Sequence, residues 1–528
     1  MRRLVHNTLI VISFAFPLAL SCEKEEEVAA PYVLKSIEPM QASVTLGRGK
    51  GSEISFHVDE PGYSFNYDVQ SPDCVVSLKL QGGREPEGFA LSRIIKTGDG
   101  DYTATITDLG TEPVYRETVC LVVKVGDNSY ITSRYFTVAS AGVGDGDLIV
   151  KTGLPIVYVD TWGKEIDSKE TDVRASLKIN GIGRFQDLEE VSCRIRGRGN
   201  TTWCWPKKPY LVKMDEKQSV FGLPKHKRWV LLANFMDRTL MRNIIAFKVG
   251  SMMSNLDWTP HCQSVELVLN GKHQGTYLLV EPVRADDDRV PCEDGFLFEC
   301  DFHYDNPVQW MDPHGECVQM WGGIPFAVKY PDSKELTPQQ LTGAKALVSS
   351  AATAIYDGGE YSKYIDVASF IDYWIVFEVM GNHELGNPGS VYMHTLSEKG
   401  RLVAGPVWDF DWGILSYRTS PQAQTGLLGR NAIWYAKLFD DPVFKAAVRK
   451  RWNEVLPSLR TVPSFIDETE KALQASSELN FAMWNPAEDA SMNNGSIING
   501  DENMNYNAAV ALLKQHFQER LEVISNNL

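Results

Sequence analysis

The hydrophobic pattern changes once along the chain, and this change constrains the fold more than any other feature. Residues 32–140 alternate apolar and polar side chains in short runs such as 53–58. Turn residues separate these runs at intervals of about ten residues, which is typical of an immunoglobulin-like β-sandwich. The glycine-rich run 141–147 that follows is predicted to be a linker.

The remaining residues, 148–528, begin with strand patterns and continue with helical ones. The turn signal Asn270-Gly271 lies between two apolar runs and predicts a β-hairpin. Strands followed by helices within one domain indicate an α+β fold, with a sheet-rich N-lobe and a helical C-lobe. Helices are predicted at 237–253, where Asp237 is the expected cap, and at 337–356, 366–381, 432–440, 441–454, 461–475 and 505–525.

Two aspartates one residue apart, Asp409 and Asp411, follow an apolar run and precede a glycine. In an extended backbone their carboxylates share a face and repel each other. Mg²⁺ offsets such repulsion, because it binds carboxylate oxygens and often completes its shell with substrate phosphates. The motif therefore predicts a metal site. A second interpretation is that Trp408, Phe410 and Trp412 are core aromatics and the aspartates only cap a turn.

Three polar residues upstream of this motif extend the candidate site. Asn382, Glu384 and Ser390 offer an amide oxygen, a carboxylate and a hydroxyl. Glu384 with either aspartate could instead form a glycosidase pair, which needs two carboxyls at a defined separation. A glycosidase, however, has no use for the basic glycine loop described next.

The basic loop places glycines between and after Arg196 and Arg198 at a strand end, where backbone N–H groups and guanidinium groups can approach an anion. Downstream, Lys213 is flanked by apolar residues on a predicted strand, a suitable position for contacting a phosphate from a sheet. The alternative interpretation of the loop is a solvated basic turn.

The N-terminus predicts export. Residues 1–21 have the basic and apolar regions of a signal peptide, and Ala19 to Cys22 resemble a bacterial lipobox in which Cys22 is lipidated. The acidic start of the tether, 22–31, resembles the export tag of Bacteroides-type lipoproteins on the outer face of the outer membrane. The expected location is therefore the cell surface, with membrane attachment through Cys22. A cleaved secretory signal with an incidental cysteine is the alternative.

Charge and cysteine content exclude other classes. A net charge of −16 disfavours nucleic-acid binding, which needs concentrated Lys and Arg. The cysteines form no CxxC pair, so a zinc ribbon is not expected. Cys74 and Cys120 are a candidate disulfide within the first domain.

Several ordered motifs in residues 150–525 together resemble the CotH-type atypical protein kinases, a family that includes the spore-coat protein H. The resemblance implies phosphoryl transfer from ATP to Ser or Thr hydroxyls of a protein, with Mg²⁺ or Mn²⁺. It is carried by Arg196–Trp203, Lys207–Tyr210, Trp229–Asn234, Asp237 with Leu240–Asn243, Gly271–Glu281 and Trp408–Asp411.

The resemblance also implies roles for single residues. Lys213, or alternatively Lys208, would contact the nucleotide phosphates, as would the arginines of the basic loop, and Glu281 would lie near the lobe hinge. Asp409 and Asp411 would bind metal, with Asn382 and Ser390 as further ligands.

The catalytic carboxylate is where this chain departs from the family. Spore-coat members place an aspartate in the segment that corresponds to 382–384, whereas this chain has Glu384, which is one methylene longer. Glutamate can still accept the proton of the acceptor hydroxyl, beside Asp409. The alternative is a catalytically inactive kinase fold that serves in adhesion or as a scaffold, which an extracellular location with little ATP would suit.

Overall fold

The structure is a computed structural model of the 528-residue chain. Cys22, the signal peptide, the tether and the linker 141–147 lie outside the residues that it describes. The described residues are 36–41, 43–46, 50–59, 74–80, 84–86, 88–109, 117–125, 129–140, 152–301, 308–315, 323–486 and 499–528.

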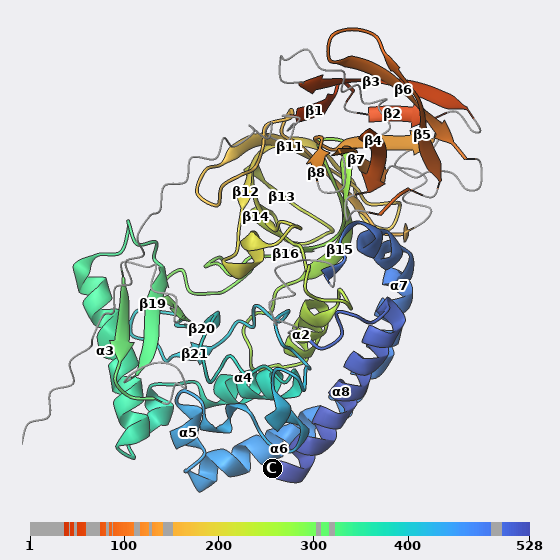
Figure 1. Ribbon diagram of the computed structural model, residues 1–528. Coiled ribbons are helices and arrows are strands. Elements are labelled where there is room, and N and C mark those ends of the chain that lie inside the picture. The colour runs from red at the N-terminus through yellow and green to blue at the C-terminus, as the bar shows by residue number, and fades with distance from the viewer. Residues whose placement is uncertain are drawn as a thin grey trace, which may run out of the picture.

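The first part of the chain forms two β-sheets that share one apolar core (Figure 1). One sheet has the order β1-β3-β6-β5, and the other has the order β2-β9-β7-β4 with β8 paired to β7. Strand β6 alternates half-buried and buried residues along its length, as the period-two pattern predicts. The strands are β1 (Ser36–Pro39), β2 (Ser43–Leu46), β3 (Gly51–Asp59), β4 (Cys74–Leu80), β5 (Phe89–Lys96), β6 (Asp101–Asp108), β7 (Glu117–Val125), β8 (Ser129–Thr132) and β9 (Phe136–Ser140).

The structure contradicts the candidate disulfide between Cys74 and Cys120. Cys120 is a buried free thiol. The antiparallel register of β4 and β7 sets Cys74 opposite Val125 and Cys120 opposite Lys79, at opposite ends of the strand pair.

Seven strands after the linker close into a barrel with the order β10-β11-β12-β13-β14-β16-β15. All neighbouring pairs are antiparallel except β10 and β15, whose parallel pairing closes the barrel. At the predicted hairpin turn, Asn270 and Gly271 both have positive φ, as a tight two-residue turn requires. The strands are β10 (Ile156–Asp160), β11 (Val173–Asn180), β12 (Leu188–Gly197), β13 (Tyr210–Gln218), β14 (His226–Leu232), β15 (Cys262–Leu269) and β16 (Lys272–Val280).

The domain that contains the barrel has a second sheet, ordered β18-β19-β17-β20-β21. This second sheet lies with most of the helices on the side of the barrel that faces away from strands β1 to β9 (Figure 1). Together they hold the largest apolar core. Among the described residues, no helix combines the length and apolar character needed to cross a membrane. The strands are β17 (Leu297–Cys300), β18 (Gln309–Asp312), β19 (Ile324–Tyr330), β20 (Val391–His394) and β21 (Val403–Ala404), and the α-helices are α2 (Arg242–Ser251), α3 (Pro338–Tyr356), α4 (Val367–Val379), α5 (Tyr435–Leu438), α6 (Pro442–Leu459), α7 (Val462–Met483) and α8 (Tyr506–Asn527).

The first of these helices begins later than predicted, because Asp237 is not its cap. The Asp237 carboxylate accepts hydrogen bonds from the backbone N–H groups of Thr239 (2.9 Å) and Arg242 (2.8 Å). It thereby stabilises a turn in front of α2, and its ion pair with the Arg242 guanidinium anchors that turn in the core. The predicted helices near residues 337 and 505 begin within one residue of the expected positions.

Candidate functional site

A cavity of about 570 Å³ lies where the barrel, the second sheet and the acidic motif meet. It brings together carboxylates and cations from segments far apart in the sequence. It is lined by Arg198, Gly199, Asn200, Thr201, Thr202, Trp205, Lys207 and Pro209 near the barrel rim, by Leu232, Ala233, Asn234 and Phe235 after β14, by Glu299, Asp301, Gln309, Ala327, Lys329 and Tyr392 at the second sheet, and by His383, Glu384, Asn387, Gly389, Ser390, Trp408, Asp409, Asp411 and Trp412.

Asp409 and Asp411 both line this cavity, but strand alternation does not bring them there. Strand β21 ends at Ala404, and the segment that carries the aspartates is irregular. Asp409 has φ +66° and Ser390 has φ +55°, a left-handed conformation that non-glycine residues rarely adopt. The Ser390 hydroxyl donates a 3.3 Å hydrogen bond to Asp409 Oδ2. The expectation of an extended backbone at the motif is therefore wrong.

Two asparagines from distant segments hold the acidic motif in place. Asn243 of α2 accepts a 2.8 Å hydrogen bond from the Phe410 N–H. Asn499 accepts one of 2.9 Å from the Gly413 N–H and donates to the Asp411 carbonyl. Asn243 belongs to a segment that carries the family resemblance, but its contact with the acidic motif, like the role of Asn499, was not predicted, because only the folded chain brings these residues to the motif.

Glu384 lies just after α4, where Asn382 fixes its backbone. The Asn382 side-chain oxygen accepts a 2.8 Å hydrogen bond from the Glu384 N–H, so this oxygen is already engaged and Asn382 does not line the cavity. Glu384 Oε2 and Asn387 Oδ1 are sealed from solvent and have no hydrogen-bond partner among the described residues. Buried polar atoms rarely lack a hydrogen bond, and these two atoms belong to residues that line the cavity.

The acidic groups perturb one another's ionisation. Burial raises the pKa of Glu384 well above its usual range, and the charges of Asp409 and Asp411 raise it further. Burial also raises the pKa of Asp411, with the charge of Asp409 as the second cause. Burial raises the pKa of Asp409 as well, and the positive charge of Arg198 opposes the rise in the pKa of both aspartates. The Arg198 guanidinium lies 5.6 Å from the ring centroid of Trp408. A bound cation would relieve this repulsion.

An ion pair that the sequence analysis missed lies on the second sheet. Lys329 Nζ, from β19, is 2.7 Å from Glu299 Oε2, from β17. The Tyr392 hydroxyl donates a 2.5 Å hydrogen bond to the other oxygen of Glu299. Because Lys329 is 41% exposed, its ammonium can reach an anion in the cavity.

Lys207 is the second lysine of the cavity wall, and it is fully buried. Its ammonium donates hydrogen bonds to the Thr276 carbonyl of β16 and to Asn480 Oδ1 of α7, the latter 2.8 Å long. Burial lowers the pKa of Lys207 to about 7, although the charge of Glu266 opposes the shift. This lysine therefore links the cavity to the contact between the barrel and α7.

Several predicted residues lie outside the cavity lining. Arg196 pairs with Asp172 at 3.7 Å, and Lys208 donates a 2.8 Å hydrogen bond to the Trp203 carbonyl. Lys213 alternates with residues of the barrel interior and so projects from the opposite face of β13. Glu281 is buried after β16 and pairs with His261 and Arg289.

The glycines of the basic loop serve packing as well as any ligand. A Cβ at Gly197 would lie 2.3 Å from the Trp203 ring. Gly199 has φ +82°, and a Cβ there would lie 2.0 Å from the Thr202 hydroxyl. Nearby, Trp205 and Trp412 stack at 5.6 Å between ring centroids and form an aromatic wall of the cavity.

The donor set of the cavity fits a hard divalent cation, because carboxylate, amide and hydroxyl oxygens converge there with unsatisfied oxygen atoms. Among the described residues, a group of three His, Cys, Asp or Glu ligand atoms within 4.8 Å of one another occurs elsewhere, at His226, Asp286 and Asp288. No three carboxylates of the cavity meet this criterion among the described residues, so a cation there would share its shell with water or substrate oxygens.

Comparison with known proteins assigns the family. Residues 195–524, more than half of the chain, match the family model described as CotH kinase protein. The chain therefore belongs to the CotH kinase family, and its mixed α/β structure is consistent with that membership. No curated protein matches the chain.

Similar solved structures include a marsupial T cell receptor, with 13% identity and a TM-score of 0.16, covering 34% of this chain and 91% of the receptor. A structure concerning T cell activation by the superantigen toxic shock syndrome toxin-1 has 10% identity and a TM-score of 0.14, covering 20% of this chain and 97% of its own. Scores this low establish no shared fold.

Proposed function

We propose that the chain is a protein kinase that transfers the terminal phosphoryl group of ATP to a Ser or Thr hydroxyl of a protein with the help of Mg²⁺ or Mn²⁺. The observation that carries the proposal is the composition of one cavity. Five carboxylates and three cations line it, and its wall includes three oxygen atoms, from Gln309, Glu384 and Asn387, that have no hydrogen-bond partner among the described residues. Phosphoryl transfer needs positioning and charge neutralisation more than covalent chemistry, and this set of groups supplies both.

The residues divide these tasks by their position. Asp409 and Asp411 would hold the divalent cation, which neutralises charge on the phosphates when bound. Lys329, oriented by Glu299, and Arg198 would contact phosphate oxygens. The geometry thus favours Lys329 over Lys213 and Lys208 for this role, because Lys329 reaches the cavity.

Glu384 would orient the acceptor hydroxyl and take its proton. Its environment raises its pKa, and a carboxylate with a raised pKa is the stronger base once it is ionised. The neighbouring aspartates cause part of this shift, so a cation bound to them would favour ionised Glu384. This arrangement lets glutamate perform the task of the aspartate in the spore-coat members.

The test is phosphate transfer by the purified chain with labelled ATP and Mg²⁺ or Mn²⁺. We expect Asp409→Asn and Glu384→Gln each to lower the rate by about 100-fold or more, as loss of a group that stabilises the transition state does. Lys329→Met should lower it similarly, whereas the matched variant Lys213→Met should retain it. No transfer, together with no metal-dependent thermal shift by ATP, would support the inactive scaffold instead.

A second proposal concerns the location of the chain. Lipidation at Cys22 would anchor it to the outer face of the outer membrane, and the two-sheet domain, as an immunoglobulin-like spacer, would hold the kinase domain away from the lipid. Labelled palmitate should enter the wild-type chain but not Cys22→Ala. Protease added to intact cells should digest the wild-type chain if it is exposed at the surface.

A further inference from the structure

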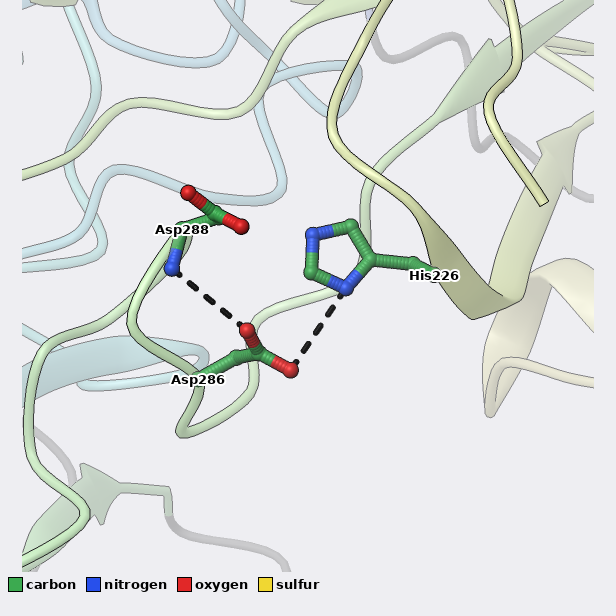
Figure 2. Close-up of side chains that lie close together, drawn as sticks. All are labelled: His226, Asp286 and Asp288. Carbon is green, nitrogen blue, oxygen red and sulfur yellow. Dashed lines mark hydrogen bonds and ion pairs between the residues drawn. The ribbon is translucent and has the colours of Figure 1, made fainter. Parts of the chain in front are cut away.

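Three potential metal ligands meet at the rim of the barrel, away from the cavity. His226 begins β14, and Asp286 and Asp288 lie in the segment between β16 and β17 (Figure 2). One ligand atom from each residue lies within 4.8 Å of the others. None of the three lines the cavity, so they have no part in the proposed kinase site.

The imidazole of His226 carries the inference. Its side chain is only 3% exposed, and its Nε2 atom is sealed from solvent without a hydrogen-bond partner in the part of the chain that the structure describes. Figure 2 shows that Nδ1 points to Asp286, at 3.5 Å from Oδ2, and that the other ring nitrogen faces Asp288. An unpaired buried polar atom costs free energy, which a ligand at this position would recover.

The run of aspartates beside His226 favours a cation, although the positive charges of buried Arg289 and of Lys217 also act on the imidazole. Asp286, Asp287 and Asp288 are consecutive, and the charges of Asp287 and Asp286 raise the pKa of nearby Glu293. Lys217 Nζ, 3.8 Å from Asp286 Oδ2, is a partial counter-charge, but it is 59% exposed and can swing away.

The segment is also held in a fixed shape, which keeps its ligands near His226. The Asp288 N–H lies 3.4 Å from Asp286 Oδ1, and the Arg289 N–H donates a 2.9 Å hydrogen bond to the Asp286 carbonyl. Arg289 in turn donates a 3.0 Å hydrogen bond to the Arg228 carbonyl of β14. The segment is therefore fastened to the strand that carries His226.

We propose that His226, Asp286 and Asp288 bind a divalent transition-metal ion, with Zn²⁺ as the best match, and that the ion ties the β16–β17 segment to the barrel. Zn²⁺ accepts one imidazole and two carboxylates with water as the fourth ligand, whereas Mg²⁺ prefers oxygen ligands alone. Ligands around Zn²⁺ lie about 3.4 Å apart in a tetrahedron, given metal–ligand distances of about 2.1 Å. Asp288 is exposed, so its side chain is free to close the remaining gap.

The test is a calorimetric titration of the full, EDTA-treated chain with Zn²⁺, together with a thermal shift. The wild-type chain should bind one equivalent at this site and unfold at a higher temperature when loaded. Asp288→Ala changes an exposed side chain, so the fold is kept, yet affinity should fall at least tenfold and the thermal shift should disappear. Asp409→Asn, which alters only the cavity, should keep the equivalent of Zn²⁺ that Asp288→Ala loses.

Three results would overturn the proposal: no Zn²⁺ binding by the wild-type chain, unchanged affinity in Asp288→Ala, or loss in Asp409→Asn of the same equivalent that Asp288→Ala loses. The last would place the ion in the cavity. Cobalt substitution adds a direct readout, because the visible spectrum of Co²⁺ should change between the wild type and His226→Ala.

Discussion

Two glutamates near the end of α4, Glu378 in its last turn and Glu384 in the segment after it, have opposite surroundings. Glu378 is fully buried and fully paired: the Arg520 guanidinium lies 2.7 Å from its Oε2, and the backbone N–H groups of Leu428 and Gly429 donate to its carboxylate. Glu384 has a sealed oxygen that no described residue pairs with, and two aspartates close enough to raise its pKa.

The difference separates a carboxylate that stabilises the fold from one that is available for chemistry. Burial penalises the charged form of both glutamates, but only Glu378 has a guanidinium to offset the penalty. Sites that bind ligands commonly retain such unrelieved charge, at a cost in stability. Removing the partner of Glu378 should therefore lower the free energy of unfolding, whereas removing the charge of Glu384 should raise it.

The largest effect is expected at Arg520, which donates to the Glu378 carboxylate and to the Ala423 and Gly426 carbonyls. Arg520→Met would leave Glu378 buried without its cation, so we expect the free energy of unfolding to fall by about 3–5 kcal/mol. Equilibrium urea denaturation measures this loss. The double variant with Glu378→Gln should recover part of it, whereas a loss below about 1 kcal/mol would contradict the comparison.

Lys207 provides an intermediate case, a buried amine satisfied by neutral oxygen atoms. Because its pKa falls from 10.5 to about 7 on folding, the unfolded chain holds a proton between these values that the folded chain lacks. Stability should therefore rise with pH from about 7 to 10, by up to about 1.4 kcal/mol per pH unit. When the free energy of unfolding is plotted against pH over this range, the wild type and Lys207→Met should differ in slope. Parallel plots would show that Lys207 stays charged in the folded chain.

Glu384→Gln should have a smaller effect on stability, in the opposite direction from Arg520→Met. The folded pKa of Glu384 is raised, so stability is lost as the pH climbs above the unfolded value of 4.5. In EDTA at pH 7 to 8, the variant should be more stable than the wild type by on the order of 1 kcal/mol. This gain should disappear near pH 4, where the carboxyl is protonated in both states. A less stable variant at pH 8 would mean that Glu384 has a partner after all.

Local signals predicted the elements, while contacts across the fold decided the site. The turn at Asn270-Gly271 and the start of α3 depend on neighbouring residues, and both followed from the sequence. The ion pair of Lys329 with Glu299 depends on the pairing of β19 with β17, strands separated by a long connection. No spacing in the sequence signals that pairing.

Strand geometry explains why Lys213 looked suitable and yet lies outside the cavity. Its apolar neighbours correctly indicated a strand, but barrel closure turned those neighbours inward and Lys213 to the other face. The left-handed backbone at Asp409 was equally hidden, because nothing in a run of apolar and acidic residues signals a positive φ. The sequence thus located the acidic motif but not the backbone geometry that directs its carboxylates.

Ser390 should give the smallest effect and tests whether the aspartates depend on protein partners at all. Its hydroxyl donates one long, exposed hydrogen bond, of 3.3 Å, to Asp409. An exposed bond of this kind contributes little, so Ser390→Ala should change the free energy of unfolding by less than about 0.5 kcal/mol. If Ser390 also contacts the metal, the concentration of Mg²⁺ needed for half-maximal phosphate transfer should rise several-fold while stability stays constant. Equal Mg²⁺ dependence in both chains would limit the role of Ser390 to its contact with Asp409 and leave the aspartates as the groups that hold the ion.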